Sequence, residues 1–173
     1  MQVTRKIRAL VIGSLAAAAA TAGVVATGPA ASAANLRTPV QLSIGNPDVL
    51  EVGVGLNQPV QFGFNNNTNV EKWRVEYTGV KVNGRPEFKL RSKQNNQCLG
   101  ATSAKAGIQL QTKNCNLSNT RWYIGGDSKP GPKPLYLSGT NLVVTKFNKV
   151  QLQPDNGSAN QQVKFRLLYG QTA

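Results

Sequence analysis

Residues 98–124, "CLGATSAKAGIQLQTKNCNLSNTRWYI", decide the fold because two other stretches of the chain repeat their order of residue types. The first is "VLEVGVGLNQPVQFGFNNNTNVEKWRV", residues 49–75, and the second is "LVVTKFNKVQLQPDNGSANQQVKFRL", residues 142–167. Each stretch has an apolar pair, an apolar-Gln-apolar strand, an Asn-rich loop, and an aromatic residue that opens a final strand. The chain is therefore predicted to contain three copies of one unit.

The spacing of two landmarks supports this repeat. The central glutamines lie 48 and 42 residues apart, at Gln61, Gln109 and Gln151. The closing aromatic residues lie 49 and 43 residues apart, at Trp73, Trp122 and Phe165. One more strand precedes each unit, at residues 40–43, 88–92 and 135–138. Because a four-stranded unit cannot cover its own apolar side, we expect three units to close around one core, with the aromatic residues as counterparts about a pseudo-threefold axis.

The pattern of the whole chain favours an all-β fold. Beyond residue 33 no window shows the i, i+3, i+4, i+7 apolar pattern of an amphipathic helix, and short alternating runs are separated by Gly, Asn, Pro and Ser clusters. The Pro-rich residues 128–135 lie between two copies and are too few for a domain linker. We predict a single domain over residues 34–173, with repeats at about 38–80, 85–127 and 133–170.

The first 33 residues are typical of a cleaved signal peptide. A basic start is followed by an Ala-rich apolar run over residues 9–25 and by Ala-Ser-Ala at residues 31–33, a small-residue cleavage site. The alternative is a membrane anchor, but the run is short, mostly Ala, and interrupted by Gly13 and Gly23. We expect a secreted, extracellular protein of bacterial type.

The charge of the chain is strongly positive. Three of its 20 Lys and Arg residues precede residue 34, so the predicted mature chain keeps 17 of them against seven Asp and Glu residues, a net charge of +10. Such a charge favours anionic surfaces and polymers, and it equally fits a merely soluble basic surface. Nucleic acid is not predicted as a partner, because no binding motif and no aromatic stacking platform can be located.

The two cysteines, Cys98 and Cys115, are predicted to form a disulfide, since an exported chain meets an oxidising compartment. The chain has no CxxC pattern and no histidine, so neither a metal site nor a cofactor is expected, and the usual imidazole base of a nucleophilic enzyme is missing. A carboxylate-pair glycosidase would need Asp48 and Glu51, or Glu71 and Glu76, to converge in space. We predict that the protein is not an enzyme.

The middle copy resembles the ricin-type β-trefoil lectin domain, the family with Gln-x-Trp repeats. Cys98-Leu99, Ile-Gln-Leu at residues 108–110, Cys115 and Asn-Thr-Arg-Trp at residues 119–122 stand in the order of that family. The resemblance covers about residues 39–169 and is weaker in the first copy, which has no cysteine, and in the third, where Phe165 replaces Trp. It implies a six-stranded barrel capped by three hairpins.

The resemblance also implies one shallow sugar pocket per repeat. In the family an Asp two residues after the first Cys, an aromatic residue after the x-Q-L strand, and an Asn three residues before the Trp bind the sugar. The matching positions are Glu51, Gly63 and Val70, then Gly100, Gln111 and Asn119, then Val143, Gln153 and Gln162. No repeat keeps the whole set, so the sugar sites are degenerate. The candidate ligand-binding residues are Glu51, Phe64, Asn67, Asn119 and Gln162.

The sequence leaves three functions open. The first is a non-catalytic, monomeric glycan-binding protein that recognises a glycan or cell-surface polysaccharide through its hairpin loops. The second is a protein-binding trefoil such as a protease inhibitor, which would present residues 65–69 or 128–134 to a partner. The third is the binding of anionic polymers through the charge of +10.

Overall fold

The computed structural model describes residues 39–45 and 48–168, and the predicted signal peptide lies outside them. Within these ranges the chain forms strands and three short 3-10 helices, with no α-helix. The strands are β1 (Val40–Ile44), β2 (Val49–Val52), β3 (Val60–Gly63), β4 (Trp73–Val82), β5 (Arg85–Ser92), β6 (Cys98–Gly100), β7 (Gln111–Lys113), β8 (Trp122–Ile124), β9 (Lys133–Leu137), β10 (Leu142–Lys146), β11 (Val150–Pro154) and β12 (Gln162–Leu167). The 3-10 helices are η1 (Asn69–Glu71), η2 (Ser118–Thr120) and η3 (Ala159–Gln161). Among the described residues, no helix has the length and apolar character that crossing a membrane requires.

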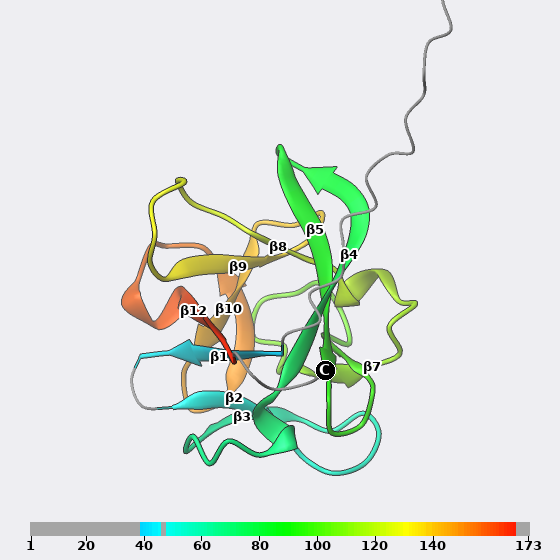
Figure 1. Ribbon diagram of the computed structural model, residues 1–173. Coiled ribbons are helices and arrows are strands. Elements are labelled where there is room, and N and C mark those ends of the chain that lie inside the picture. The colour runs from blue at the N-terminus through cyan, green and yellow to red at the C-terminus, as the bar shows by residue number, and fades with distance from the viewer. Residues whose placement is uncertain (1–38, 46–47, 169–173) are drawn as a thin grey trace, which may run out of the picture. The chain divides into compact units, whose positions relative to one another are not determined.

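Six of the strands form a closed barrel (Figure 1). β1 pairs with β4, β4 with β5, β5 with β8, β8 with β9, β9 with β12, and β12 returns to β1, all antiparallel. The alternation of residue types builds this barrel, because the apolar residues Val40, Leu42 and Ile44 of β1 belong to the core. The polar residues between them point outward, where Ser43 is half-exposed and Gln41 is covered by its contacts with Asn65 and Glu71. Every strand of the barrel has two hydrogen-bonded neighbours, so the barrel has no free edge.

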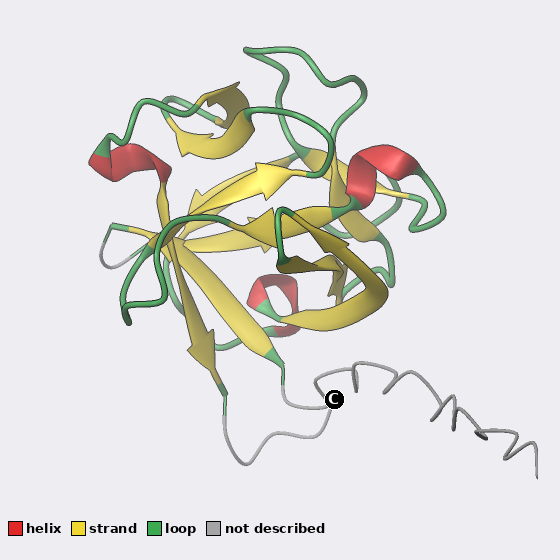
Figure 2. Cartoon of the chain, turned by 90° about the horizontal axis from the view of Figure 1, so that it is seen from above, coloured by secondary structure: helices red, strands yellow, loops and turns green. Residues whose placement is uncertain are grey.

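Three hairpins, β2–β3, β6–β7 and β10–β11, cap the barrel. Their main chains meet near one axis: the Val60 amide donates to the Leu110 carbonyl at 3.0 Å, and the Leu110 amide donates to the Val150 carbonyl at 2.9 Å. All three side chains are fully buried. Figure 2 shows the three 3-10 helices set apart from one another around the strands. The predicted β-trefoil, with three four-stranded repeats about a pseudo-threefold axis, is confirmed.

The register of the barrel corrects one predicted set of counterparts. In each repeat one residue of the first strand pairs with the fourth strand, and the residue three positions later pairs with the second strand. These pairs are Val40 with Trp73, Phe88 with Trp122, and Lys133 with Val163. Val163, not Phe165, is therefore the counterpart of the two tryptophans. Phe165 lies two residues further along β12, opposite Leu42, where it packs against the core and meets Phe88 edge to face.

The register also changes the counterpart of the central glutamines. Gln61 lies opposite Glu51 in the first hairpin, and the same place in the other hairpins holds Gln111 and Gln151. Gln109, which the x-Q-L pattern predicted as the middle counterpart, lies before β7 and bridges to Gln151. A shift of two residues preserves the alternation of inward and outward side chains, so the pattern alone could not distinguish the two glutamines.

Two tryptophans stabilise the core, both through their large buried rings and through hydrogen bonds from the indole nitrogen. The Trp73 Nε1 donates to the Leu50 carbonyl at 3.1 Å, and the Trp122 Nε1 donates to the Leu99 carbonyl at 2.9 Å. Both rings are fully buried, so these bonds satisfy donors that would otherwise be costly to desolvate. The Cys98–Cys115 disulfide is present and joins β6 to the loop that follows β7.

Two residues before the Trp73, Trp122 and Val163 positions stand three buried polar side chains: Glu71, Thr120 and Gln161. Each holds the loop before its strand. Glu71 is fully buried, and its carboxylate accepts from the amides of Asn66 and Asn67, from the Thr68 hydroxyl and from the Gln41 amide group. These equivalent residues fix the loops that border the predicted sugar pockets.

Candidate functional site

In the first repeat, the predicted acid is turned onto its own hairpin. The Glu51 Oε1 accepts a hydrogen bond from the Gln61 Nε2 at 2.9 Å. The carboxyl group lies across Gly63, where an added Cβ would come within 2.2 Å of it. Phe64 is 73% exposed, and Asn67 lies in the exposed loop that Glu71 holds. The structure thus places the Glu51 carboxyl group beside the main chain of β3.

In the second repeat, the predicted sugar position is filled by the protein itself. An added Cβ on Gly100 would lie 2.8 Å from the Thr120 Cγ2 and 3.0 Å from the Asn119 carbonyl oxygen, so no acidic side chain fits there. Asn119, which the resemblance assigned to the sugar, donates through its Nδ2 to the Ala101 carbonyl. The Ala101 amide donates back to the Asn119 carbonyl at 3.1 Å. The amide group of Asn119 thus joins η2 to β6.

In the third repeat, the register moves both predicted positions. Thr145, not Val143, is the counterpart of Glu51, since it pairs with Gln151 as Glu51 pairs with Gln61. Its side chain is buried and its hydroxyl accepts from the Gln161 Nε2 at 3.3 Å. Gln162 is the first residue of β12 and lies opposite Pro134. The position three residues before Val163 belongs to Asn160, so assigning Gln162 to the sugar amide position was wrong.

The two loops predicted to bind a partner protein are held by different intramolecular contacts. The Glu71 carboxylate accepts hydrogen bonds from the amides of Asn66 and Asn67 and so fixes residues 65–69, in which Asn67 adopts a positive φ of 57°. Residues 128–132 lie in the exposed loop between β8 and β9, where Asp127 accepts hydrogen bonds from the Lys129 amide and the Lys133 ammonium. The neighbouring Lys133 ammonium and Lys129 amide lower the pKa of Asp127.

The outer side of the barrel offers three positions that the repeat makes equivalent. They lie on the boundaries between repeats, which we call seams, where the last strand of one repeat pairs with the first strand of the next. At each seam one cross-strand pair stands at the same place, and side chains paired in this way point to the same face of a sheet. The three pairs are Arg74 with Arg91, Tyr123 with Tyr136, and Lys164 with Ser43.

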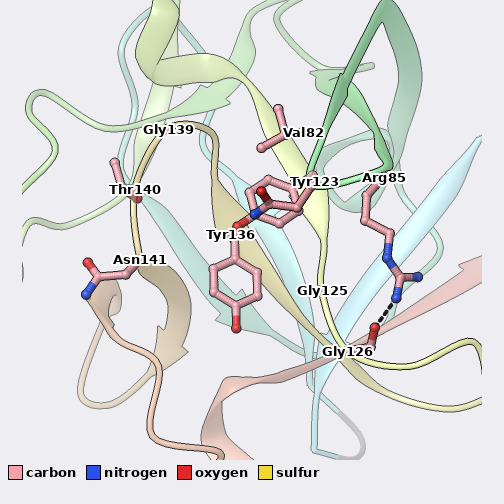
Figure 3. Close-up of a pocket in the computed structure, with 10 residues that line it drawn as sticks. Val82, Arg85, Tyr123, Gly125, Gly126, Tyr136, Gly139, Thr140 and Asn141 are labelled. Carbon is pink, nitrogen blue, oxygen red and sulfur yellow. Dashed lines mark hydrogen bonds between the residues drawn. The ribbon is translucent and has the colours of Figure 1, made fainter.

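A large cavity lies at the tyrosine seam, between the tip of the β4–β5 hairpin, β8, β9 and the β9–β10 turn (Figure 3). Its volume is about 880 Å³. The residues that line it are Val82, Asn83, Arg85, Tyr123, Gly125, Gly126, Tyr136, Gly139, Thr140 and Asn141. The lining thus combines two aromatic rings and three glycines with hydroxyl, amide and guanidinium groups. We call this cavity the tyrosine cleft.

The tyrosine pair is rigidly placed. The Tyr123 and Tyr136 rings stack with their centroids 5.0 Å apart and their planes 8° from parallel. The Tyr136 ring also lies across Gly125, where an added Cβ would come within 2.1 Å of its Cε2. Its hydroxyl donates to the Asp155 carboxylate. Burial and this hydrogen bond raise the pKa of Tyr136 to about 12, so the phenol is neutral at ordinary pH.

The polar rim of the tyrosine cleft comes from two turns. The β4–β5 hairpin extends past an irregularity between Tyr77 and Lys81 and brings Asn83 and Arg85 over the cleft. The Arg85 guanidinium donates to the Gly126 carbonyl, which joins the hairpin tip to the β8–β9 loop (Figure 3). On the other side stand Thr140 and Asn141 of the β9–β10 turn. Residues with amide, guanidinium and hydroxyl groups therefore line the tyrosine cleft around the tyrosine pair.

The arginine seam is closed by its own contacts. Arg91 forms a two-pronged ion pair with Glu76 through its Nε and Nη2 atoms. Its Nη1 donates to the Asn96 carbonyl at 2.9 Å, and Arg74 donates to the Asn96 Oδ1 at 2.9 Å. Among the described residues both guanidinium groups of this seam make intramolecular hydrogen bonds, while the buried Arg74 Nε has no partner.

All seven acidic residues have an intramolecular partner. Asp48 pairs with Lys146 at 2.5 Å, Glu51 accepts from Gln61, and Glu71 holds its loop, so the carboxylate pairs considered for a glycosidase are used in other contacts. The remaining four partners are Arg91 for Glu76, Ser138 for Glu87, Lys133 for Asp127 and Tyr136 for Asp155. Across the described ranges, no group of three or more His, Cys, Asp or Glu gathers to hold a metal ion.

Sequence reasoning missed the tyrosine cleft because it searched each repeat for the family's hairpin pocket. Tyr123 follows the Trp landmark of the second repeat, and Tyr136 lies in the strand that opens the third. Outward positions on the two strands of a predicted hairpin can face each other, and that signal was present in the sequence.

No known protein family and no curated protein matches the sequence. In structure, the chain is similar to a designed threefold-symmetric protein, ThreeFoil, with a TM-score of 0.63 and 17% identity over 73% of this chain and 96% of that one. It is similar to the Polyporus squamosus lectin bound to Neu5Aca2-6Galb1-4GlcNAc, with a TM-score of 0.63 and 13% identity over 76% and 49% of the two chains. It is also similar to the Rhizoctonia solani agglutinin, with a TM-score of 0.61 and 17% identity over 75% and 95%. Lectins recur among such neighbours, although one is a galactanase. The fold they share with this chain is the β-trefoil.

Proposed function

We propose that the protein is a secreted, non-catalytic glycan-binding β-trefoil whose sugar site is the tyrosine cleft rather than the hairpin pockets. The observation that carries this proposal is the stacked pair Tyr123 and Tyr136 inside a cavity of about 880 Å³. The lectins among the structural neighbours support glycan binding at the level of the fold.

The chemistry of the tyrosine cleft fits a neutral sugar. A pyranose ring has an apolar C–H face and a rim of hydroxyl groups, so it needs a flat aromatic surface with donors and acceptors around it. Tyr136 supplies the surface, and its ring is fixed by Tyr123, Gly125 and Asp155. Because the ring is already ordered, binding costs little side-chain entropy.

The rim supplies the polar contacts. Asn83 and Asn141 carry amide groups that can both donate to and accept from sugar hydroxyls, and Thr140 adds a hydroxyl whose proton is already donated to the Leu137 carbonyl at 2.9 Å. No carboxylate lines the cleft, which removes the acid and base of a glycosidase from this site. We therefore propose binding without hydrolysis.

The test is a glycan array at low and moderate salt, followed by titration of the best neutral oligosaccharide and NMR mapping of the shifts. Binding is expected to move the resonances of Tyr136, Asn83 and Asn141. Tyr136→Ala and Asn141→Ala should each weaken the neutral oligosaccharide by about tenfold or more, equivalent to about 1.4 kcal/mol. Asn141→Ala changes a rim residue only, so it remains informative if Tyr136→Ala unfolds the protein.

The matched control is Phe64→Ala, which removes an exposed aromatic side chain beside the first hairpin pocket. It should leave the affinity unchanged. If Phe64→Ala abolishes binding while Asn141→Ala does not, the sugar occupies the hairpin pocket and the assignment to the tyrosine cleft is wrong. If the folded protein binds no glycan at all, the proposed function fails.

A further inference from the structure

The remaining seam, between β12 and β1, contains a pocket of about 320 Å³. It is lined by Gln41, Ser43, Gly45, Val49, Asn65, Lys164 and Arg166. Its volume suits about one sugar unit. We call this pocket the serine pocket, because Ser43 stands where the tyrosine seam has Tyr136 and the arginine seam has Arg91.

The serine pocket is open because its seam residue is small. At the tyrosine seam, the Tyr136 side chain spans the seam and its hydroxyl reaches Asp155. The hairpin register makes Asn65 the counterpart of Asp155, since each lies four residues beyond the central glutamine of its repeat. A serine hydroxyl cannot span that gap, so the space that an aromatic ring fills at one seam stays empty at the other.

Gln41, one of the residues that line the serine pocket, has a buried acceptor without a partner. Gln41 is 1% exposed, and its Nε2 donates to the Asn65 Oδ1 and the Glu71 Oε2, both at 2.9 Å. These two bonds fix the orientation of the amide group. The Gln41 Oε1 is buried and has no hydrogen-bond partner among the described residues. A buried acceptor without a partner is unfavourable, and a donor from a ligand would remove that cost.

Two cations stand on the same face. Lys164 lies opposite Ser43 and Arg166 lies opposite Gln41 in the β1–β12 ladder, so all four side chains point outward from the barrel. Both cations are exposed, and within the described ranges neither makes a hydrogen bond or an ion pair with its side chain. The carboxylate bonded to Gln41, that of Glu71, is buried and already accepts four hydrogen bonds.

We propose that the serine pocket is a second ligand subsite, selective for a sugar unit that carries an anionic group, either a carboxylate or a sulfate ester. A hydroxyl of the sugar donates to the Gln41 Oε1. The anionic group accepts from Lys164 and Arg166, and Ser43 and Asn65 add neutral contacts. This subsite shares no lining residue with the tyrosine cleft, so its proposal is tested independently of neutral-sugar binding in the cleft.

The proposal is tested with three oligosaccharides of equal length: an oligogalacturonate, a chondroitin sulfate fragment and a neutral galactan fragment. Calorimetric titration of the whole secreted chain is carried out at two salt concentrations, with NMR detection of the Gln41 side-chain amide. At least one anionic fragment should bind in preference to the neutral one and shift the Gln41 amide. Comparison of the two anionic fragments tells a carboxylate from a sulfate ester.

The decisive variant is Ser43→Tyr, which copies the residue found at the tyrosine seam and fills the serine pocket without altering charge. It should weaken the anionic fragment by about tenfold or more and leave binding at the tyrosine cleft unchanged. The double variant Lys164→Ala with Arg166→Ala should have an equal or larger effect.

The control is Lys105→Ala with Lys149→Ala, which removes the same charge from two exposed lysines elsewhere. If this control weakens the anionic fragment as much as Lys164→Ala with Arg166→Ala does, the interaction is a diffuse effect of net charge and the subsite does not exist. Unchanged binding in folded Ser43→Tyr, or no binding of either anionic fragment to the wild type, would overturn the proposal equally.

Discussion

Replacing Glu71 with Gln should destabilise the protein far more than its single-atom change suggests. The Glu71 Oε1 accepts from the Asn66 amide and the Thr68 hydroxyl, and its Oε2 accepts from the Asn67 amide and the Gln41 Nε2, over 2.9–3.1 Å. Gln has one oxygen and one NH₂ group. With the NH₂ group in the place of Oε2, two donors lose their acceptor. With the NH₂ group in the place of Oε1, the Asn66 amide loses its acceptor, while the Thr68 hydroxyl can turn and accept from the NH₂ group.

The magnitude follows from the lost hydrogen bonds. A hydrogen bond to a charged acceptor contributes roughly 1.5–3 kcal/mol, and the better orientation of the Gln side chain loses one of them, so we expect the free energy of unfolding to fall by about 2 kcal/mol. The third repeat shows why an amide is acceptable elsewhere. Gln161 accepts from the Asn156 amide with its Oε1, and its Nε2 donates to the Pro154 carbonyl and the Thr145 hydroxyl.

The assay is urea unfolding followed by tryptophan fluorescence. Glu71→Gln should lower the midpoint without changing the slope, because the surface exposed on unfolding is the same. The matched control is Glu51→Gln, in which a half-buried acid of the same repeat loses part of one hydrogen bond to Gln61, with a cost below about 1 kcal/mol. Equal effects of the two substitutions, or a loss under about 1 kcal/mol for Glu71→Gln, would refute the reasoning.

Three further predictions concern the tyrosine cleft and the disulfide. Gly125→Ala places a Cβ 2.1 Å from Tyr136, so it should displace the ring, change the near-ultraviolet circular dichroism and weaken neutral-glycan binding by about tenfold; an unchanged affinity would contradict the stacking role. Folding raises the pKa of Tyr136 from 10.0 to about 12, so its contribution to stability is complete below pH 10 and is lost as the pH rises through about 12. When thermal unfolding is measured as a function of pH, Tyr136→Phe should therefore reduce the loss of stability between pH 10 and about 12. Replacing Cys98 and Cys115 with Ala should lower the free energy of unfolding by about 3 kcal/mol in urea, since the bond closes a loop across 17 residues, and an unchanged midpoint would exclude that contribution.

The fold could be predicted because the repeat recurs in residue types that report on burial. Trp73 and Trp122 are fully buried, and the alternation around them defines which side of each strand faces inward. In the third copy the size of Phe165 predicts it as the counterpart of the tryptophans, whereas the strand register gives that place to Val163, two residues earlier. A two-residue slip keeps the alternation intact, so only pairing between strands can expose it.

The candidate site was harder to predict, because contacts across repeats decide it. The resemblance locates the family's sugar-binding positions at Gly100 and Asn119. The space beside Gly100 is filled only because η2 packs against β6. Tyr123 and Tyr136 are ordinary outward residues until the barrel places them side by side. The sequence contains the residues of both seam cavities, and only the closed barrel shows that Ser43 and Tyr136 are alternatives at one position.

The hydrogen bond from the Leu168 amide to the Pro39 carbonyl, at 3.0 Å, brings the two ends of the described chain together beside the barrel. Because these two ends are adjacent, a chain that begins at another loop can in principle form the same strand pairs. A rearranged gene that joins residue 168 to residue 39 and opens the exposed segment at 128–132 would encode the same strand pairs in a new order. We therefore expect the architecture to tolerate circular permutation, with new termini that place a fused domain away from the seam cavities or toward either one.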